Sequence, residues 1–285
     1  MPRTAKELEA LLDLERIDDN LFRGIQPETG LQRVFGGQVA AQALVAAART
    51  MAPDQFVHSL HSYFLLPGDI EVPIVYDVES VRDGKSFATR RVVARQHGRP
   101  IYVMTASFQV AEEGFDHQDQ MPDVRPPEEA LDLAELSRAR SADASEVWDK
   151  DWAALDVRYL GNSRVGGVED DPTRPARAQM WVRVGDRLSD DAVTQAAAFT
   201  FASDLTLLGS TLITHKVLIG TPAVQAASLD HTIWFHRPFR ADEWWLYDQH
   251  SPSASGARGL GLARIFSQDG RLVASVAQEG LIRPR

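Results

Sequence analysis

The chain contains no cysteine among its 285 residues. This absence excludes disulfide bonds, thiolate catalysis and any zinc or iron–sulfur site built on cysteine ligands. Lysine is also scarce, because it supplies only four of the 30 basic residues, and the formal net charge is −10. Nucleic acids attract clustered Lys and Arg through their phosphates, so we expect no nucleic acid as a partner.

Long apolar runs are missing as well. The stretch with the least charge, residues 192–214, is interrupted by Asp204 and contains several Ser and Thr residues, and we expect no membrane insertion. The N-terminus reads "MPRTAKELEALLDLERI", a charged amphipathic helix pattern rather than the apolar core of a signal peptide. The absence of cysteine favours a reducing compartment, and we expect a cytoplasmic location.

Several common site motifs are absent too. The eight histidines include no HExxH pair, and the strand spacings of His58 with His61 and of His231 with His236 place each pair on opposite faces. No G-x-S-x-G, no P-loop and no G-x-G-x-x-G opening a helix occurs. We therefore expect no metal and no cofactor.

The sequence repeats itself. "HSLHSYFLLPG" from His58 matches "SLDHTIWFHRP" from Ser228 at an offset of 170, and "QHGRPIYV" from Gln96 matches "QDGRLVAS" from Gln268 at an offset of 172. In the second match, a polar residue and a Gly lie between apolar runs, which is typical of a hairpin. Two similar halves are therefore predicted, with the small difference in offset attributed to a loop insertion.

Each half has the pattern of one long helix and a run of mostly antiparallel strands, which predicts an α+β fold. We expect an N-terminal domain over residues 1–112, a linker with a short helix over 113–177, and a C-terminal domain over 178–285. The first half has a predicted helix at 35–51 and strands at 57–66, 73–81, 87–96 and 100–110. The second half has a predicted helix at 190–203 and strands at 232–236, 244–250, 258–267 and 272–282.

Asp204 is the only ionisable residue between Ala192 and Thr214. A carboxylate in such apolar surroundings loses hydration, which raises its pKa and makes it a candidate base. The alternative is that Ser203 or Asp204 only caps a following turn.

Ser228 and Gln278 are candidates for holding a water molecule, because a hydroxyl and an amide both donate and accept hydrogen bonds. The alternative for each is ordinary bonding to the local backbone. By the two offsets, Ser228 corresponds to His58 and Gln278 corresponds to Ala106. A polar residue that its sister copy replaces with Ala is not needed for the fold, which favours Gln278 as a site residue more than Ser228.

Arginines on or beside predicted strands are candidates for binding phosphate groups, with a solvated sheet edge as the commoner role. They are Arg90, Arg91, Arg258 and Arg264.

Five segments in order resemble the acyl-CoA thioesterase II family: "FRGIQPETGLQRVFGGQVAAQAL", "HSLHSYFLLPGD", "YDVESVRDGKSFATRRV", "SLDHTIWFHRPFRADEWWLY" and "QDGRLVASVAQEG". The resemblance covers nearly the whole chain apart from residues 115–174. It implies a tandem, or double, hotdog fold, in which two copies of a long helix wrapped by a curved antiparallel sheet share one chain. It also implies hydrolysis of fatty acyl-CoA to free acid and coenzyme A.

The resemblance implies that Asp204, Ser228 and Gln278 are catalytic, with Ser228 in a position that the family fills with Thr or Ser. Asp204 would activate a water molecule that the other two hold. The first half would form part of the acyl and coenzyme A site, and we count Phe35, His58, Tyr63, Arg90 and Arg258 as substrate-contacting candidates. A homodimer or homotetramer is expected, and the C-terminal "LIRPR" is not a peroxisomal signal, which again favours the cytoplasm.

Two other functions are compatible with this fold. One is a non-catalytic acyl-CoA sensor, which would be expected to lack one of the three catalytic residues. The other is a further acyl-CoA activity such as enoyl-CoA hydration, for which Asp230 and His231 are the candidate pair. Adjacent strand residues face opposite ways, so this pair is a poor one.

Overall fold

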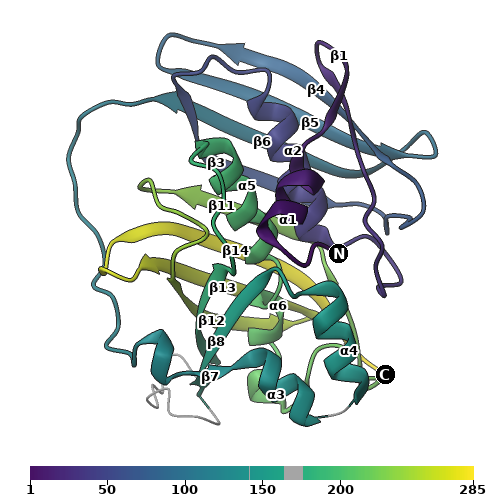
Figure 1. Cartoon of the computed structure of the whole chain (residues 1–285), viewed down its shortest axis with the longest axis vertical. Coiled ribbons are helices and arrows are strands. Elements are labelled where there is room, and N and C mark those ends of the chain that lie inside the picture. Colours follow the sequence, from purple (N-terminus) through teal and green to yellow (C-terminus); the bar gives the residue numbers. More distant parts are fainter. Residues whose placement is uncertain (141, 164–175) are drawn as a thin grey trace.

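A computed structural model describes residues 1–140, 142–163 and 176–285. Two central helices are wrapped by antiparallel strands, those of the first half above and those of the second half below (Figure 1). The helices are α1 (Ala5–Leu12), α2 (Gly36–Ala48), α3 (Leu133–Arg140), α4 (Ala142–Asp151), α5 (Ala192–Ser203) and α6 (Leu207–Ser210), with 3-10 turns η1 (Pro127–Glu129) and η2 (Ile213–His215). The predicted double hotdog is confirmed.

The strands form one sheet in the order β1-β2-β4-β5-β6-β3-β11-β14-β13-β12-β9-β8-β7, with β10 also paired to β14. Strands β3 and β11 pair antiparallel, with Ser62 opposite His231, and so join the two halves edge to edge. The strands are β1 (Glu15–Asp18), β2 (Leu21–Gly24), β3 (Gln55–Phe64), β4 (Ile74–Asp83), β5 (Phe87–Gln96), β6 (Arg99–Val110), β7 (Leu131–Asp132), β8 (Leu155–Asn162), β9 (Arg177–Val184), β10 (Val224–Ser228), β11 (Asp230–Phe235), β12 (Trp245–Ser255), β13 (Arg258–Ser267) and β14 (Leu272–Pro284).

The two core helices are built from small and apolar residues. Every residue of α2 from Gly37 to Ala47 is buried, because the Ala-rich sequence favours helix and lets neighbouring elements approach closely. Asp191 caps the start of helix α5, because its side chain accepts a hydrogen bond from the Thr194 N–H at 2.8 Å. The start of α2 lies against the end of α5, since a Cβ atom at Gly37 would lie 2.3 Å from the Phe201 carbonyl oxygen.

The apolar stretch Ala192–His215 has the length and composition of a membrane-crossing helix. In this fold it is divided among α5, α6 and η2, and most of it is buried inside the protein. Packing around α5 in the core accounts for its apolar character.

Residues 113–177 hold more structure than the single short helix that we expected. They contain η1, α3 and α4, and the strands β7 and β8 extend the second half of the sheet. The segments "VRYLG" and "AQMWVRV" lie in β8 and β9. Residues 164–175 lie outside the described part of the chain.

The predicted offset of 170 for the first repeat is wrong by one residue. His58 is an extra residue in β3, because the register with β6 shifts between Val57 and Ser59. Leu229 interrupts the second copy at the same point, between β10 and β11. Aligning these two residues gives an offset of 171, so Ser228 corresponds to Val57 rather than to His58.

The close approach at Gly37 makes a testable prediction about stability. Helix propensity alone would favour Gly37→Ala by about 1 kcal/mol. The new Cβ, however, would lie 2.3 Å from the Phe201 backbone oxygen, which cannot move aside as the end of a flexible side chain could. We therefore expect Gly37→Ala to lower the free energy of unfolding by about 1–3 kcal/mol, measured by urea denaturation.

Gly114→Ala is the matched control, because a Cβ there would meet nothing within 4 Å. Equal stability of the two variants would contradict the close helix contact.

Candidate active site

Three elements of the second half bring Asp204, Ser228 and Gln278 together. Asp204 is the residue that ends α5, Ser228 is the last residue of β10, and Gln278 lies within β14. Strands β10 and β14 are paired, with Ser228 opposite Gly280, so the two polar side chains lie near each other beside the end of the helix.

The three side chains form one hydrogen-bonded cluster. The Ser228 hydroxyl donates to Asp204 Oδ1 at 3.3 Å, and Gln278 Nε2 donates to the same oxygen. Gln278 Nε2 also donates to Ser228 Oγ at 3.1 Å. The Gly37 backbone N–H at the start of α2 is a further donor to Asp204.

The carboxyl group of Asp204 has a pKa close to neutral pH. Burial raises its pKa from 3.8 to about 6, while hydrogen bonds from Gln278, Ser228 and the Gly37 N–H act in the opposite direction by stabilising the charged form. A carboxylate with such a pKa is mostly ionised at pH 7 and has a higher proton affinity than an exposed aspartate. These properties suit a general base.

Two glycines leave room for this carboxylate, a role that was not predicted from the sequence. A Cβ atom at Gly36 would lie 2.6 Å from Asp204 Oδ2 and 2.9 Å from the ring of Phe64. Gly37 supplies the backbone donor described above and the contact with α5. The signal in the sequence that could have revealed this contact is the Gly-Gly pair in "VFGGQ".

One acceptor in the cluster has no partner among the described residues. Gln278 is fully buried, and its Oε1 atom accepts no hydrogen bond from that part of the chain, although buried amide oxygens are normally satisfied. Ser228 is only partly buried, so the cluster has an accessible side. A water molecule that reached this place would find an acceptor in Gln278 and a base in Asp204.

The neighbouring pair Asp230 and His231 does not form an acid–base unit. His231 is fully buried and its Nε2 lies 2.8 Å from the hydroxyl of Ser203. Asp230 is partly buried and accepts a hydrogen bond from the Glu279 N–H at 2.6 Å. Burial lowers the pKa of His231 to about 4, so its ring is neutral at pH 7. The opposite orientation predicted for adjacent strand residues is confirmed.

The substrate-contacting candidates of the first half are spread over several places. Phe35 precedes α2 and packs edge-on against Phe201 and Trp152, with ring centroids 5.2 and 4.8 Å away. Phe35 therefore immediately precedes Gly36 and Gly37, the two glycines beside Asp204. Tyr63, in contrast, is 61% exposed on the outer face of β3.

Arg90 and His58 do not lie beside Asp204. Arg90 is 4% exposed, and its guanidinium donates to Thr50 beyond the end of α2 and to Asp83. These contacts occupy its donors, so it holds the fold together rather than presenting a free phosphate ligand. His58 bonds to Ser107 near the same end of α2, which is the end remote from Asp204.

Arg258 lies at the surface of the second half. It is about half exposed and forms an ion pair with Glu279 at 2.9 Å, the residue that follows Gln278. Within the described residues, no three His, Asp or Glu side chains are grouped in a way that could hold a metal ion.

Comparisons with known proteins match both halves. One family model, described as acyl-CoA thioesterase, matches residues 170–281, and another, described as its N-terminal domain, matches residues 26–109. The chain is 40% identical over 278 residues to acyl-CoA thioesterase 2 of Haemophilus influenzae, covering 96% of each chain. The chain belongs to the acyl-CoA thioesterase family.

Two more relatives of this thioesterase are similar over almost all of its length. Acyl-coenzyme A thioesterase 8 of Homo sapiens is 40% identical, with 96% of this chain and 88% of the human protein covered. A crystal structure of an acyl-CoA thioesterase II, TesB2, from Mycobacterium marinum is 45% identical and superposes with a TM-score of 0.82, covering 98% of this chain and 97% of that one.

The hydrogen bonds to Asp204 predict a pH effect. If Asp204 acts as the base, kcat/KM of the wild type should rise with pH with a midpoint near 6, because a base acts when it has lost its proton. Gln278→Ala removes a donor that stabilises the carboxylate, so the midpoint of the remaining activity should move to higher pH.

The measurement is a pH–rate profile for both proteins. Ser228→Thr is the control, since it keeps the hydroxyl donor and should leave the midpoint unchanged. A midpoint for Gln278→Ala at or below the wild-type value would show that the amide does not stabilise the charged base.

Proposed function

We propose that this acyl-CoA thioesterase hydrolyses fatty acyl-CoA with Asp204 as the general base and with Ser228 and Gln278 as the residues that position water. The observation that carries the proposal is the cluster itself: a buried carboxylate with a pKa near 6, bonded to a hydroxyl and an amide. Each of the three side chains has the chemistry that its role needs.

The proposed reaction starts with a water molecule that donates one hydrogen bond to Gln278 Oε1 and the other to Asp204. Its oxygen attacks the thioester carbonyl carbon while its proton passes to the carboxylate, and the tetrahedral intermediate then expels coenzyme A as a thiolate. The proton held by Asp204 then passes to the thiolate, which regenerates the base, and the products are the fatty acid and the thiol. A thiol has a pKa of about 8.5, so this leaving group needs no strong general acid.

The developing negative charge on the carbonyl oxygen needs hydrogen-bond donors. We assign this role to the start of α2, where the preceding residue Phe35 provides no side-chain cap. The Gly37 N–H binds Asp204, and the other first-turn N–H groups, those of Gly36 and Gln38, point out of the helix end. The partial positive charge at a helix N-terminus acts in the same direction. Helix α2 belongs to the first half. On this proposal the first half supplies backbone N–H donors, and the second half supplies the side chains of the site.

The other functions weighed from the sequence are less well supported. An acyl-CoA sensor would have no use for a polarised base with two water-binding partners, and the hydratase pair is lost because Asp230 and His231 point apart. We further propose a cytoplasmic homodimer or homotetramer that does not insert into membranes. The acidic net charge of −10 supports little attraction to anionic lipid, and closed symmetric assemblies are the commonest oligomers.

Asp204→Asn tests the catalytic assignment, because it keeps the shape of the side chain and removes the base. We expect kcat for release of free thiol from acyl-CoA to fall by about 10²–10⁴-fold. The assay follows thiol release over a series of acyl chain lengths.

The matched control is Asp230→Asn, a nearby carboxylate on the paired strand β11, which should retain activity within about threefold on this proposal. Full activity of Asp204→Asn, or a larger loss in Asp230→Asn than in Asp204→Asn, would remove Asp204 from the role of base.

A further inference from the structure

A cavity of about 1100 Å³ lies at the end of the helix pair remote from Asp204. Its walls include Leu44 and Ala48 from the last turns of α2 and Val193 and Ala196 from the first turns of α5. The catalytic cluster contributes no residue to it. With a helix rise of about 1.5 Å per residue, Ala48 lies roughly 16 Å along α2 from Gly37.

The cavity occupies the place that corresponds, through the repeat, to the active site of the other half. Val57, which lines it, corresponds to Ser228 at the offset of 171 fixed by the two bulged positions. Ala106 is fully buried in β6 and is not among the lining residues; it corresponds to Gln278 at the offset of 172. The same framework of two helix ends and two strands therefore recurs here with apolar side chains in place of the water-positioning ones.

A difference in chain length explains why this end is open. In the second half, residues 204–223 connect α5 to β10, and their α6 packs on the sheet, with Leu208 against Gly280 and Leu207 against Gly261. In the first half, only residues 49–54 connect α2 to β3. Within the described residues, no counterpart of α6 covers the corresponding surface, and the large residue Phe108 lies in the wall where the other half has Gly280.

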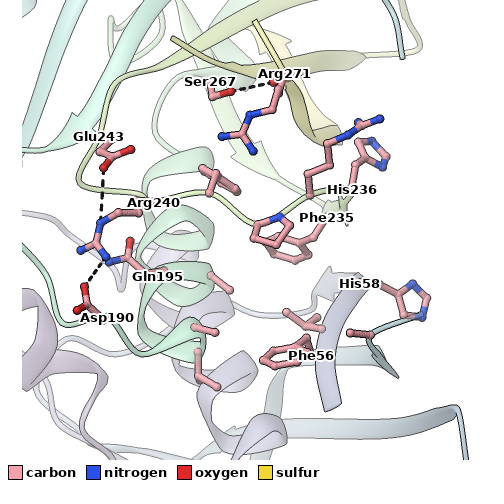
Figure 2. A pocket seen from close by; sticks show the side chains of 18 of the residues that line it. Phe56, His58, Asp190, Gln195, Phe235, His236, Arg240, Glu243, Ser267 and Arg271 are labelled. Atoms are coloured by element: carbon pink, nitrogen blue, oxygen red, sulfur yellow. Dashed lines mark hydrogen bonds and ion pairs between the residues drawn. The ribbon is translucent and has the colours of Figure 1, made fainter. Parts of the chain in front are cut away.

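The cavity has an apolar interior and a charged rim. Phe56, which is 49% exposed, and Phe235 lie on opposite sides of it (Figure 2). Five carboxylates and four guanidinium groups are among the lining residues. All four arginines form ion pairs: Arg183 with Asp156, Arg237 with Asp116, Arg240 with Asp190 and Asp242, and Arg271 with Asp269 through its Nε atom. A ligand with several phosphate charges would find no cluster of free cations here.

We propose that this cavity is a second, non-hydrolytic site that binds a long-chain fatty acid with a free carboxylate. The inference rests on the proposed function, because it takes the acyl-binding framework around Asp204 as its template. An aliphatic chain matches the apolar walls, and its burial is favourable by the hydrophobic effect. One carboxylate needs only one cation, whereas coenzyme A needs several.

Arg271 is the residue that suits this carboxylate. It lies on the same side of the cavity as Phe235 (Figure 2), is about half exposed, and engages Asp269 through Nε at 2.9 Å. A guanidinium carries five N–H donors, so the terminal nitrogens remain able to hold a carboxylate in a paired geometry.

The test is palmitate binding to the full-length protein by titration calorimetry, with and without a saturating non-hydrolysable thioether analogue of palmitoyl-CoA. Two palmitate sites per chain are expected, and the analogue should displace palmitate from only one of them. Ala196→Trp fills the cavity and should abolish the site that the analogue does not displace, while thiol release stays within about twofold of wild type. Ala254→Trp, on an exposed part of β12, is the control and should keep both sites.

Arg271→Gln gives a second reading that does not alter the core, and it should weaken only the undisplaced site, by about tenfold. A single palmitate site in the wild type, two sites retained in Ala196→Trp, or an analogue that fills both sites would each overturn the proposal. A change of oligomeric state in Ala196→Trp with palmitate binding intact would assign the cavity to a subunit contact and overturn it as well. Failure of the catalytic assignment would show separately, as unimpaired thiol release by Asp204→Asn.

Discussion

The meeting of two helix ends is the constraint on which the rest of this molecule depends. Helix α2 starts where α5 stops, and the gap is so small that neither Gly36 nor Gly37 has room for a Cβ atom. This contact places the carboxylate of Asp204 beside the positive end of a helix from the other half. The sheet wraps around the pair and joins through β3 and β11, which brings β10 and β14 to the same carboxylate.

The buried groups near this contact affect stability in opposite directions. Because folding raises the pKa of Asp204 from 3.8 to about 6, its contribution to stability is lost as pH rises between these values. Folding lowers the pKa of His231 from 6.5 to about 4, so its contribution grows over an overlapping range. The two effects offset each other between about pH 4 and 6, so this pair of buried groups gives stability no steep net dependence on pH in that range.

The sequence predicted most of the framework and the members of the cluster. Asp204 was identifiable because no other charge lies near it in the chain, and Gln278 because its counterpart is Ala106. The bulge at His58 was not visible, since one extra strand residue leaves no mark in composition or alternation. The positions of His58 and Arg90 at the far end of α2 could not be derived from the sequence either. Which end of a strand faces a site depends on how the two halves dock.

The edge-to-edge joint between β3 and β11 has a consequence for how this protein could diverge. In a symmetric dimer of separate chains, each substitution appears at both equivalent sites at once. Here both copies of the framework belong to one polypeptide, so a change at Val57 leaves Ser228 untouched. Because the two halves are separate segments of one chain, a substitution in one half need not occur in the other. The two ends of the helix pair can therefore diverge in chemistry.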